Sequence, residues 1–161
     1  MRMGTVPFLA VVLGALTLFF PSPSSGEMVL AVPDFQAVGC PQHLGGAVAE
    51  QIRGKLTGRG PWTVLESSQM TRIAAEHRLS MSGLVDDKKA VAVGKVLGAQ
   101  YLVLGTVNAV GSVFTLTARF VDVATGVVHS GFQTVSHEGE EGLLKAAEVL
   151  TDDISLELGG S

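Results

Sequence analysis

The clearest periodic pattern in this sequence lies between Val113 and Val123, where apolar and polar residues alternate. Phe114, Leu116, Ala118 and Phe120 fall on one side, and Thr115, Thr117 and Arg119 fall on the other. Alternation with period two is typical of a strand with one buried and one solvated face. The apolar strand Tyr101–Ala109 precedes it across the short turn Gly111-Ser112. After the turn Ala124-Thr125-Gly126, a further strand is expected from Val127 to about Ser136.

Two shorter apolar runs nearer the N-terminus also predict strands. Val29–Phe35 reads VLAVPDF, and Trp62–Leu65 reads WTVL. Pro33 has no backbone N–H, so the first strand either lies at a sheet edge or stops pairing there. A loop with Gly39 and Pro41 follows. We expect the two strands to be parallel neighbours joined by a right-handed crossover through a helix.

Apolar residues at helical spacing predict the helices between these strands. The first has the narrow stripe Leu44, Val48, Ile52 and Leu56, with Glu50, Arg53 and Lys55 elsewhere around its axis. Ser67 or Ser68 is the expected cap of the second, whose shared face is Met70, Ile73, Ala74 and His77.

A third and a last helix follow from the same spacing. Asp86 or Asp87 is the expected cap of the third, which Gly98 ends. Its inward residues are Ala90, Val93, Val96 and Leu97. After a polar acidic loop, Glu138–Gly142, the last helix has the inward stripe Leu143, Ala147, Leu150, Ile154 and Leu158.

These elements predict an α/β fold (α+β). Its mixed β-sheet has about five strands and is covered by three to four helices, in the order βαβααβββα.

The first 26 residues predict a signal peptide. Arg2 supplies the positive charge, Val6–Phe20 is an uncharged apolar run, and the small residues of Pro21–Gly26 suit cleavage near Gly26. The alternative is an uncleaved membrane anchor, but a spanning helix needs roughly 20 residues and this shorter run contains Pro7. We therefore expect residues 1–26 to be removed and residues 27–161 to form one exported α/β domain.

Composition excludes some function classes. The formal net charge of the 161 residues is −4, and no segment gathers lysine and arginine. Nucleic-acid binding and a polybasic membrane patch therefore lack their electrostatic basis. Cys40 is the single cysteine, so no intramolecular disulfide can form. It is a buried thiol, a redox-sensitive loop residue or an intermolecular disulfide partner.

Candidate chemistry is sparse. Cys40 and His43 form a C-x-x-H pair near Asp34, but a structural zinc site needs four ligands and a catalytic one needs three plus water. His77 is expected on a helix face, and His129 and His137 on solvated strand positions. We expect no cofactor, no metal and no small-molecule substrate. A small metal- or thiol-dependent enzyme using Cys40, His43 and Asp34 is the alternative.

Other polar residues and glycines have structural interpretations. Asp122 precedes a turn, where its side chain can accept from turn amides. Asp152 and Asp153 lie on the wet side of the last helix. The glycines form no phosphate-binding motif, and Gly105 inside a strand marks a bulge or a close backbone approach.

The sheet edges are candidates for recognition. The strand with Pro33 is one candidate edge, and the strand with His129, Gly131 and Gln133 on one face is the other. An exposed edge is a template for strand addition by a partner. The alternative is that the final helix or a loop covers that edge.

Several segments resemble the CsgG-type family of bacterial envelope proteins, which includes the curli secretion channel subunit and LpoB-type activators of peptidoglycan synthases. A related fold occurs in the N-terminal domain of TolB. The matching segments are Val29–Phe35, the helix Leu44–Leu56, Trp62–Met70 (WTVLESSQM), Glu76, Val93–Val107 (VGKVLGAQYLVLGTV) and Ala118–Ser130 (ARFVDVATGVVHS). The resemblance covers nearly all of residues 27–161 and consists of positions that support the fold.

Three departures from the family pattern limit what the resemblance implies. The lipobox cysteine is absent, and Glu66-Ser67 replaces a common Glu-Arg pair. Between Val107 and Val113 there are too few residues for the membrane-crossing hairpin of the channel-forming members, since a barrel strand needs roughly 9–11 residues.

The resemblance implies an exported, non-enzymatic envelope protein. Its expected partner is another envelope protein in curli-related secretion, outer-membrane biogenesis or peptidoglycan-synthase regulation, with homo-oligomers a second expectation. The partner-binding residues are unknown from the sequence. The predicted location is the periplasm, with any association with the outer membrane made through a partner.

Overall fold

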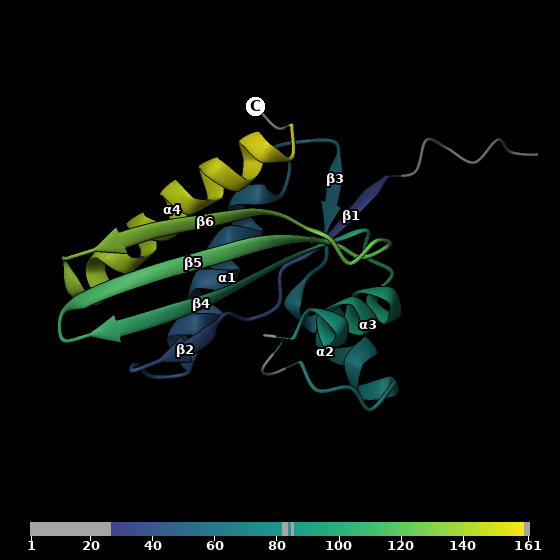
Figure 1. Cartoon of the computed structure of the whole chain (residues 1–161), viewed down its shortest axis with the longest axis horizontal. Coiled ribbons are helices and arrows are strands. Elements are labelled where there is room, and N and C mark those ends of the chain that lie inside the picture. The colour runs from purple at the N-terminus through teal and green to yellow at the C-terminus, as the bar shows by residue number, and fades with distance from the viewer. Residues whose placement is uncertain (1–26, 82–83, 85, 160–161) are drawn as a thin grey trace, which may run out of the picture.

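The computed structural model describes residues 27–81, 84 and 86–159, which form one mixed sheet with helices on both faces (Figure 1). The strands are β1 Met28–Ala31, β2 Gln36–Val38, β3 Trp62–Val64, β4 Tyr101–Val110, β5 Val113–Asp122 and β6 Val128–Ser136. The helices are α1 His43–Leu56, α2 Ser67–Glu76, α3 Asp87–Leu97 and α4 Gly139–Glu157. The predicted fold class is confirmed, and the expected signal peptide, residues 1–26, lies outside the described residues.

The strand order is β3-β1-β4-β5-β6, and β2 pairs with β4 beyond the end of β1. β1 is parallel to β3, as predicted, and also to β4. β4, β5 and β6 form an antiparallel meander. The turn Gly111-Ser112 closes the first hairpin, with Val110 opposite Val113.

The predicted N-terminal strand is split in two. β1 ends at Ala31, and the chain pairs again only at Gln36, a strand that the sequence did not predict. Strand pairing therefore stops at Pro33, as one of the two alternatives predicted. The other alternative is wrong, because β1 lies between β3 and β4 in the interior of the sheet. The sheet consequently has six strands where about five were predicted.

Two hydrophobic clusters fill the space on either side of the sheet. The first lies under α1 and α4, and it includes the predicted stripes Leu44, Val48, Ile52, Leu56 and Leu143, Ala147, Leu150, Ile154. It also receives Phe114, Leu116, Ala118 and Phe120, the predicted buried face of β5. The second lies under α2 and α3 and includes Met70, Ala90, Val93, Leu97, Leu102, Leu104 and Val121. The alternation along β5 therefore places successive residues in turn on the face of α1 and α4 and on the opposite face.

Helix ends differ from the predictions at two places. The N-cap of α2 is Glu66, not Ser67 or Ser68, and its N–H donates to Oε1 of Gln69 at 3.2 Å. The segment Glu138–Gly142 was predicted as a loop, but α4 begins at Gly139 and has Glu140 and Glu141 in its first turn. Carboxylates there are favourable because they face the positive end of the helix dipole.

The ends of α3 match the predictions. The carboxylate of Asp86 accepts from the N–H of Lys88 at 2.8 Å, and Gly98 ends the helix in the left-handed conformation with φ 69°.

Gly105 marks a close approach and no bulge. It pairs with Ala118 in unbroken register. A Cβ on Gly105 would lie 2.5 Å from the carbonyl oxygen of Thr117 and closer still to the ring of Phe35. The missing side chain therefore leaves room for Phe35, which is completely buried.

Candidate functional site

β6 forms one edge of the sheet, as the sequence suggested. Its pairing partner is β5, and within the described part of the chain no backbone hydrogen bond joins β6 to another element. Near its two ends, Val128 and Val135 have exposed fractions of 41% and 45%. An unpaired edge with exposed β-branched side chains is a template for an added strand.

α4 packs against the sheet behind β6. Leu143, Ala147 and Leu150 of α4 belong to the hydrophobic cluster on that face. Figure 1 shows α1 and α4 behind β4, β5 and β6, while α2 and α3 lie on the other face near the end where β4 begins and β5 ends. Among the described residues, neither α4 nor a loop forms backbone hydrogen bonds with the outer side of β6.

Beyond α2 and α3, this face of the strands carries neutral polar side chains and two exposed valines. The register places Gln36, Thr106, Thr117 and Gln133 in one row across β2, β4, β5 and β6. The next row is Val38, Asn108, Thr115 and Val135. The hydroxyls of Thr106 and Thr117 are 2.6 Å apart, and Nδ2 of Asn108 donates to Oγ1 of Thr106 at 3.2 Å. We call this surface the threonine face.

A bulge near one end of β6 changes how His129 is presented. Phe120 pairs with Ser130 and Val121 with Val128, so His129 is the extra residue of the bulge. Its ring centroid lies 6.3 Å from that of Phe120, and Nε2 lies 3.8 Å from Oδ2 of Asp122. His129 is exposed, as predicted, but it does not share the regular alternation of Gly131 and Gln133.

Asp122 builds the turn that leads into β6. Its Oδ1 accepts from the N–H groups of Ala124 and Thr125 at 2.8 and 2.9 Å, as predicted. The Thr125 N–H contributes most to lowering the pKa of Asp122 below its usual value, and the Ala124 N–H and the charge of His129 lower it further, while desolvation opposes them. The turn therefore contains a stabilised carboxylate with a structural role.

The residues of the enzyme alternative, Cys40, Asp34 and His43, do not form one group in the structure. The Cys40 thiol faces the carbonyl oxygen of Val107 at 3.6 Å. Asp34 lies 3.5 Å from the Arg53 guanidinium, and His43 is the exposed first residue of α1. Among the described residues, no three His, Cys, Asp or Glu side chains are grouped so that they could hold a metal ion.

The remaining histidines and carboxylates of the sequence analysis lie apart from one another. His77 is the exposed C-cap of α2, and His137 is exposed just after β6. Asp152 and Asp153 are exposed on α4, where Asp152 pairs with Arg59 at 2.5 Å.

Arg53 is a residue whose importance the sequence analysis missed. It was placed on the polar side of α1, yet its exposed fraction is 5%. Its guanidinium donates to the carbonyl oxygen of Val32 at 2.5 Å and pairs with Glu50 at 2.7 Å and Asp34 at 3.5 Å. Arg53 therefore holds the segment after β1, where Pro33 prevents a further ladder bond.

Sequence comparison assigns the fold to a family. The family described as the curli production assembly/transport component CsgG matches residues 21–115. This chain belongs to the CsgG family. No curated protein matches the sequence. Within the described residues, no helix is both long and apolar enough to cross a bilayer.

Solved structures share the fold at low sequence identity. The C-terminal domain of LpoB from Salmonella enterica is 19% identical, with a TM-score of 0.57 over 68% of this chain and 82% of that one. The PelC dodecamer from Paraburkholderia phytofirmans is 17% identical, with a TM-score of 0.55 over 84% and 89%. A lipoprotein from Neisseria meningitidis is 14% identical, with a TM-score of 0.55 over 83% and 97%. At these identities, the structures share the fold with this chain.

Proposed function

We propose that this CsgG-family protein is exported to the periplasm and acts by binding an envelope protein partner, without catalysing a reaction. Residues 1–26 are removed on export, and residues 27–161 are the working domain. The observation that carries the proposal is the exposed edge of β6 in a protein of an envelope family. The main-chain groups of that edge supply the affinity, and the threonine face beside it supplies side-chain contacts.

The partner belongs to envelope assembly, either secretion or the regulation of peptidoglycan synthesis. The resemblance to LpoB-type proteins favours a synthase regulator, and the family description favours a secretion accessory. Because the chain lacks a lipobox cysteine, contact with the outer membrane is made through the partner.

A second copy of the chain is the other candidate occupant of the edge. The related PelC structure is a dodecamer. Antiparallel addition of β6 to β6 would pair two identical edges around a two-fold axis. The test below separates the two occupants by the mass of the crosslinked product.

The test places a photoreactive residue at Gln133, an exposed position of β6, and irradiates cells that export the protein. We expect a crosslinked product that the double variant Val128→Lys/Val135→Lys reduces at least tenfold, since two lysines on an edge oppose strand addition. The matched control is Leu156→Lys, an exposed leucine on α4, which should leave the product unchanged. A product insensitive to the edge lysines, or its absence, would rule out binding at β6.

A further inference from the structure

A pocket of about 650 Å³ opens where the chain changes from one face of the sheet to the other. β1 and β3 are parallel neighbours, but the chain after β1 leads to α1 on one face and the chain after β3 leads to α2 on the opposite face. Crevices beyond the carboxyl ends of strands at such a switch point are where open α/β sheets bind ligands. Pro33, Asp34 and Phe35 after β1 and Ser67 after β3 line this pocket.

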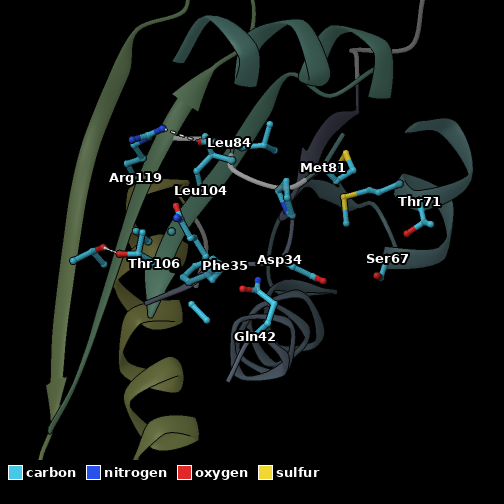
Figure 2. A pocket seen from close by; sticks show the side chains of 17 residues that line it. Asp34, Phe35, Gln42, Ser67, Thr71, Met81, Leu84, Leu104, Thr106 and Arg119 are labelled. Carbon is cyan, nitrogen blue, oxygen red and sulfur yellow. Dashed lines mark hydrogen bonds between the residues drawn. The ribbon is translucent and has the colours of Figure 1, made fainter. Parts of the chain in front are cut away.

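The inner wall of the pocket is apolar and adaptable. Leu84, Leu104 and Met70 are buried, and Met81 is half-buried. Figure 2 shows Leu84 and Leu104 near one end of the cavity and Met81 toward the other. Methionine side chains are unbranched and adjust to ligands of different shape. The volume lies within the range of about 300–1,000 Å³ that is typical of ligand sites.

Neutral hydrogen-bonding groups line the rest of the cavity. The linked hydroxyls of Thr106 and Thr117 lie on the sheet side, and Gln42, Ser67 and Thr71 lie across from them (Figure 2). Amide and hydroxyl groups beside an apolar wall can bond the main chain of an extended peptide and accept its apolar side chain. The sheet side of this pocket is continuous with the threonine face.

The charges of the pocket favour a cation. At one end, Arg119 pairs with Asp87 at 3.0 Å, which balances its charge. At the other, Asp34 shares the Arg53 guanidinium with Glu50, and Arg53 lies closer to Glu50, at 2.7 Å against 3.5 Å. Two carboxylates thus face one guanidinium. The side chain of Asp34 is 58% exposed, so this surplus negative charge is open to a ligand.

Other ligand classes fit the pocket less well. Phe35 is the aromatic residue among its lining residues, and it is completely buried, so no ring is presented for a sugar to stack on. A phosphate would be repelled by the surplus negative charge at Asp34, and the described residues that line the pocket form no glycine-rich loop of backbone N–H groups to bind it.

We propose that this pocket binds an extended peptide segment in which a lysine or arginine stands next to an apolar residue. The apolar side chain enters the space between Met70, Met81 and Leu104, and the cationic group pairs with Asp34. The peptide amides bond to the hydroxyls of Thr106 and Thr117. The site shares Thr106 and Thr117 with the threonine face but does not include the β6 edge, and the proposal does not depend on strand addition there.

Selection from a displayed library of random heptapeptides on the purified protein tests the proposal. Thr71→Trp is the blocking variant, because Thr71 is an exposed residue of α2 that lines the pocket. Ala75→Trp, one turn further along α2 and also exposed, is the matched control. We expect peptides with a basic residue beside leucine, methionine or phenylalanine to be enriched on the wild-type and Ala75→Trp proteins and not on Thr71→Trp.

A synthetic copy of an enriched peptide then tests the charge. Its Kd should rise at least fivefold in Asp34→Asn and stay unchanged in Asp153→Asn, an exposed aspartate on α4. Val128→Lys/Val135→Lys should bind the peptide as the wild type does, whatever the outcome of the crosslinking at β6. The proposal is overturned if no sequence is enriched over Thr71→Trp, if acidic peptides are enriched, or if Asp34→Asn binds equally well. Thermal melting of each variant confirms that it is folded.

Discussion

Arg53 donates a hydrogen bond to the carbonyl oxygen of Val32 at 2.5 Å, joining the last turn of α1 to the point where β1 ends. Pro33 follows Val32 and cannot continue the ladder. The guanidinium therefore takes the place of a strand partner at a buried carbonyl, and it also positions Asp34 at the rim of the pocket.

Replacing Arg53 by methionine should lower the free energy of unfolding by about 2–3 kcal/mol. The substitution keeps much of the side-chain volume but leaves the buried Val32 carbonyl without its donor, which costs about 1–3 kcal/mol, and it leaves Asp34 and Glu50 facing each other. Urea unfolding followed by circular dichroism measures the change. Lys55→Met is the control, since Lys55, on the same helix as Arg53, makes an exposed ion pair with Glu148 of α4 and such pairs contribute about 0–1 kcal/mol. Equal losses in the two variants would show that the hydrogen bond to Val32 contributes no more stability than the exposed ion pair of Lys55.

Gly105→Ala should destabilise the protein by about 1–3 kcal/mol, because the new Cβ forces the Phe35 ring and the β4–β5 pair apart. The comparison is Gly131→Ala in the edge strand β6, where a Cβ would have nothing within 4 Å. Alanine there should be neutral or stabilising by about 0.5–1 kcal/mol, as expected for glycine in a strand. Chemical denaturation of both variants distinguishes a steric cost from a general cost of changing strand glycines.

Two helix glycines, Gly98 at the left-handed end of α3 and Gly54 inside α1, should respond in opposite ways to replacement by alanine. Gly98→Ala should cost about 1–2 kcal/mol, since Gly98 has φ 69° and L-residues are strained in that region. Gly54→Ala, at an exposed position of α1 with open space around it, should stabilise by about 0.5–1 kcal/mol because alanine is the better helix former. The midpoints of urea unfolding give both values, and a loss in each variant would contradict the assignment of the α3 cap.

Asp122 should contribute to the pH dependence of stability on the acid side. Its pKa is lower in the folded chain than the ordinary 3.8, chiefly because of the Thr125 N–H. The carboxylate form therefore favours folding above the unfolded pKa, and this contribution is lost as the pH falls through the lower folded value. In Asp122→Asn the melting temperature should fall less steeply between about pH 5 and pH 3 than in the wild type. Parallel melting curves for the two proteins would contradict this role.

Most of the architecture followed from local sequence patterns. The alternation along β5 predicted four of its five buried residues, and the fifth, Val121, is buried on the opposite face under the second cluster. Asp86 and Gly98 were predicted as helix ends because caps depend on residues close in sequence.

The missed features depend on contacts between distant residues. β2 has three residues and no alternation of its own, and it is a strand only because β4 lies beside it. Arg53 has the spacing of a solvated position, and its burial is caused by a carbonyl that lies 21 positions earlier. The pocket likewise arises from segments after β1 and β3 and from the middle of β4 and β5. Because these segments are far apart in the sequence, no local motif predicts the pocket.

The central place of β1 affects how this chain reaches its native state. The meander β4–β5–β6 closes through short turns, but β1 must pair with β3 about thirty positions later and with β4 about seventy positions later. Contacts that span long stretches of chain form slowly. β1, the first strand of the described residues, is therefore among the last to gain both neighbours, and its insertion is the expected slow step of refolding.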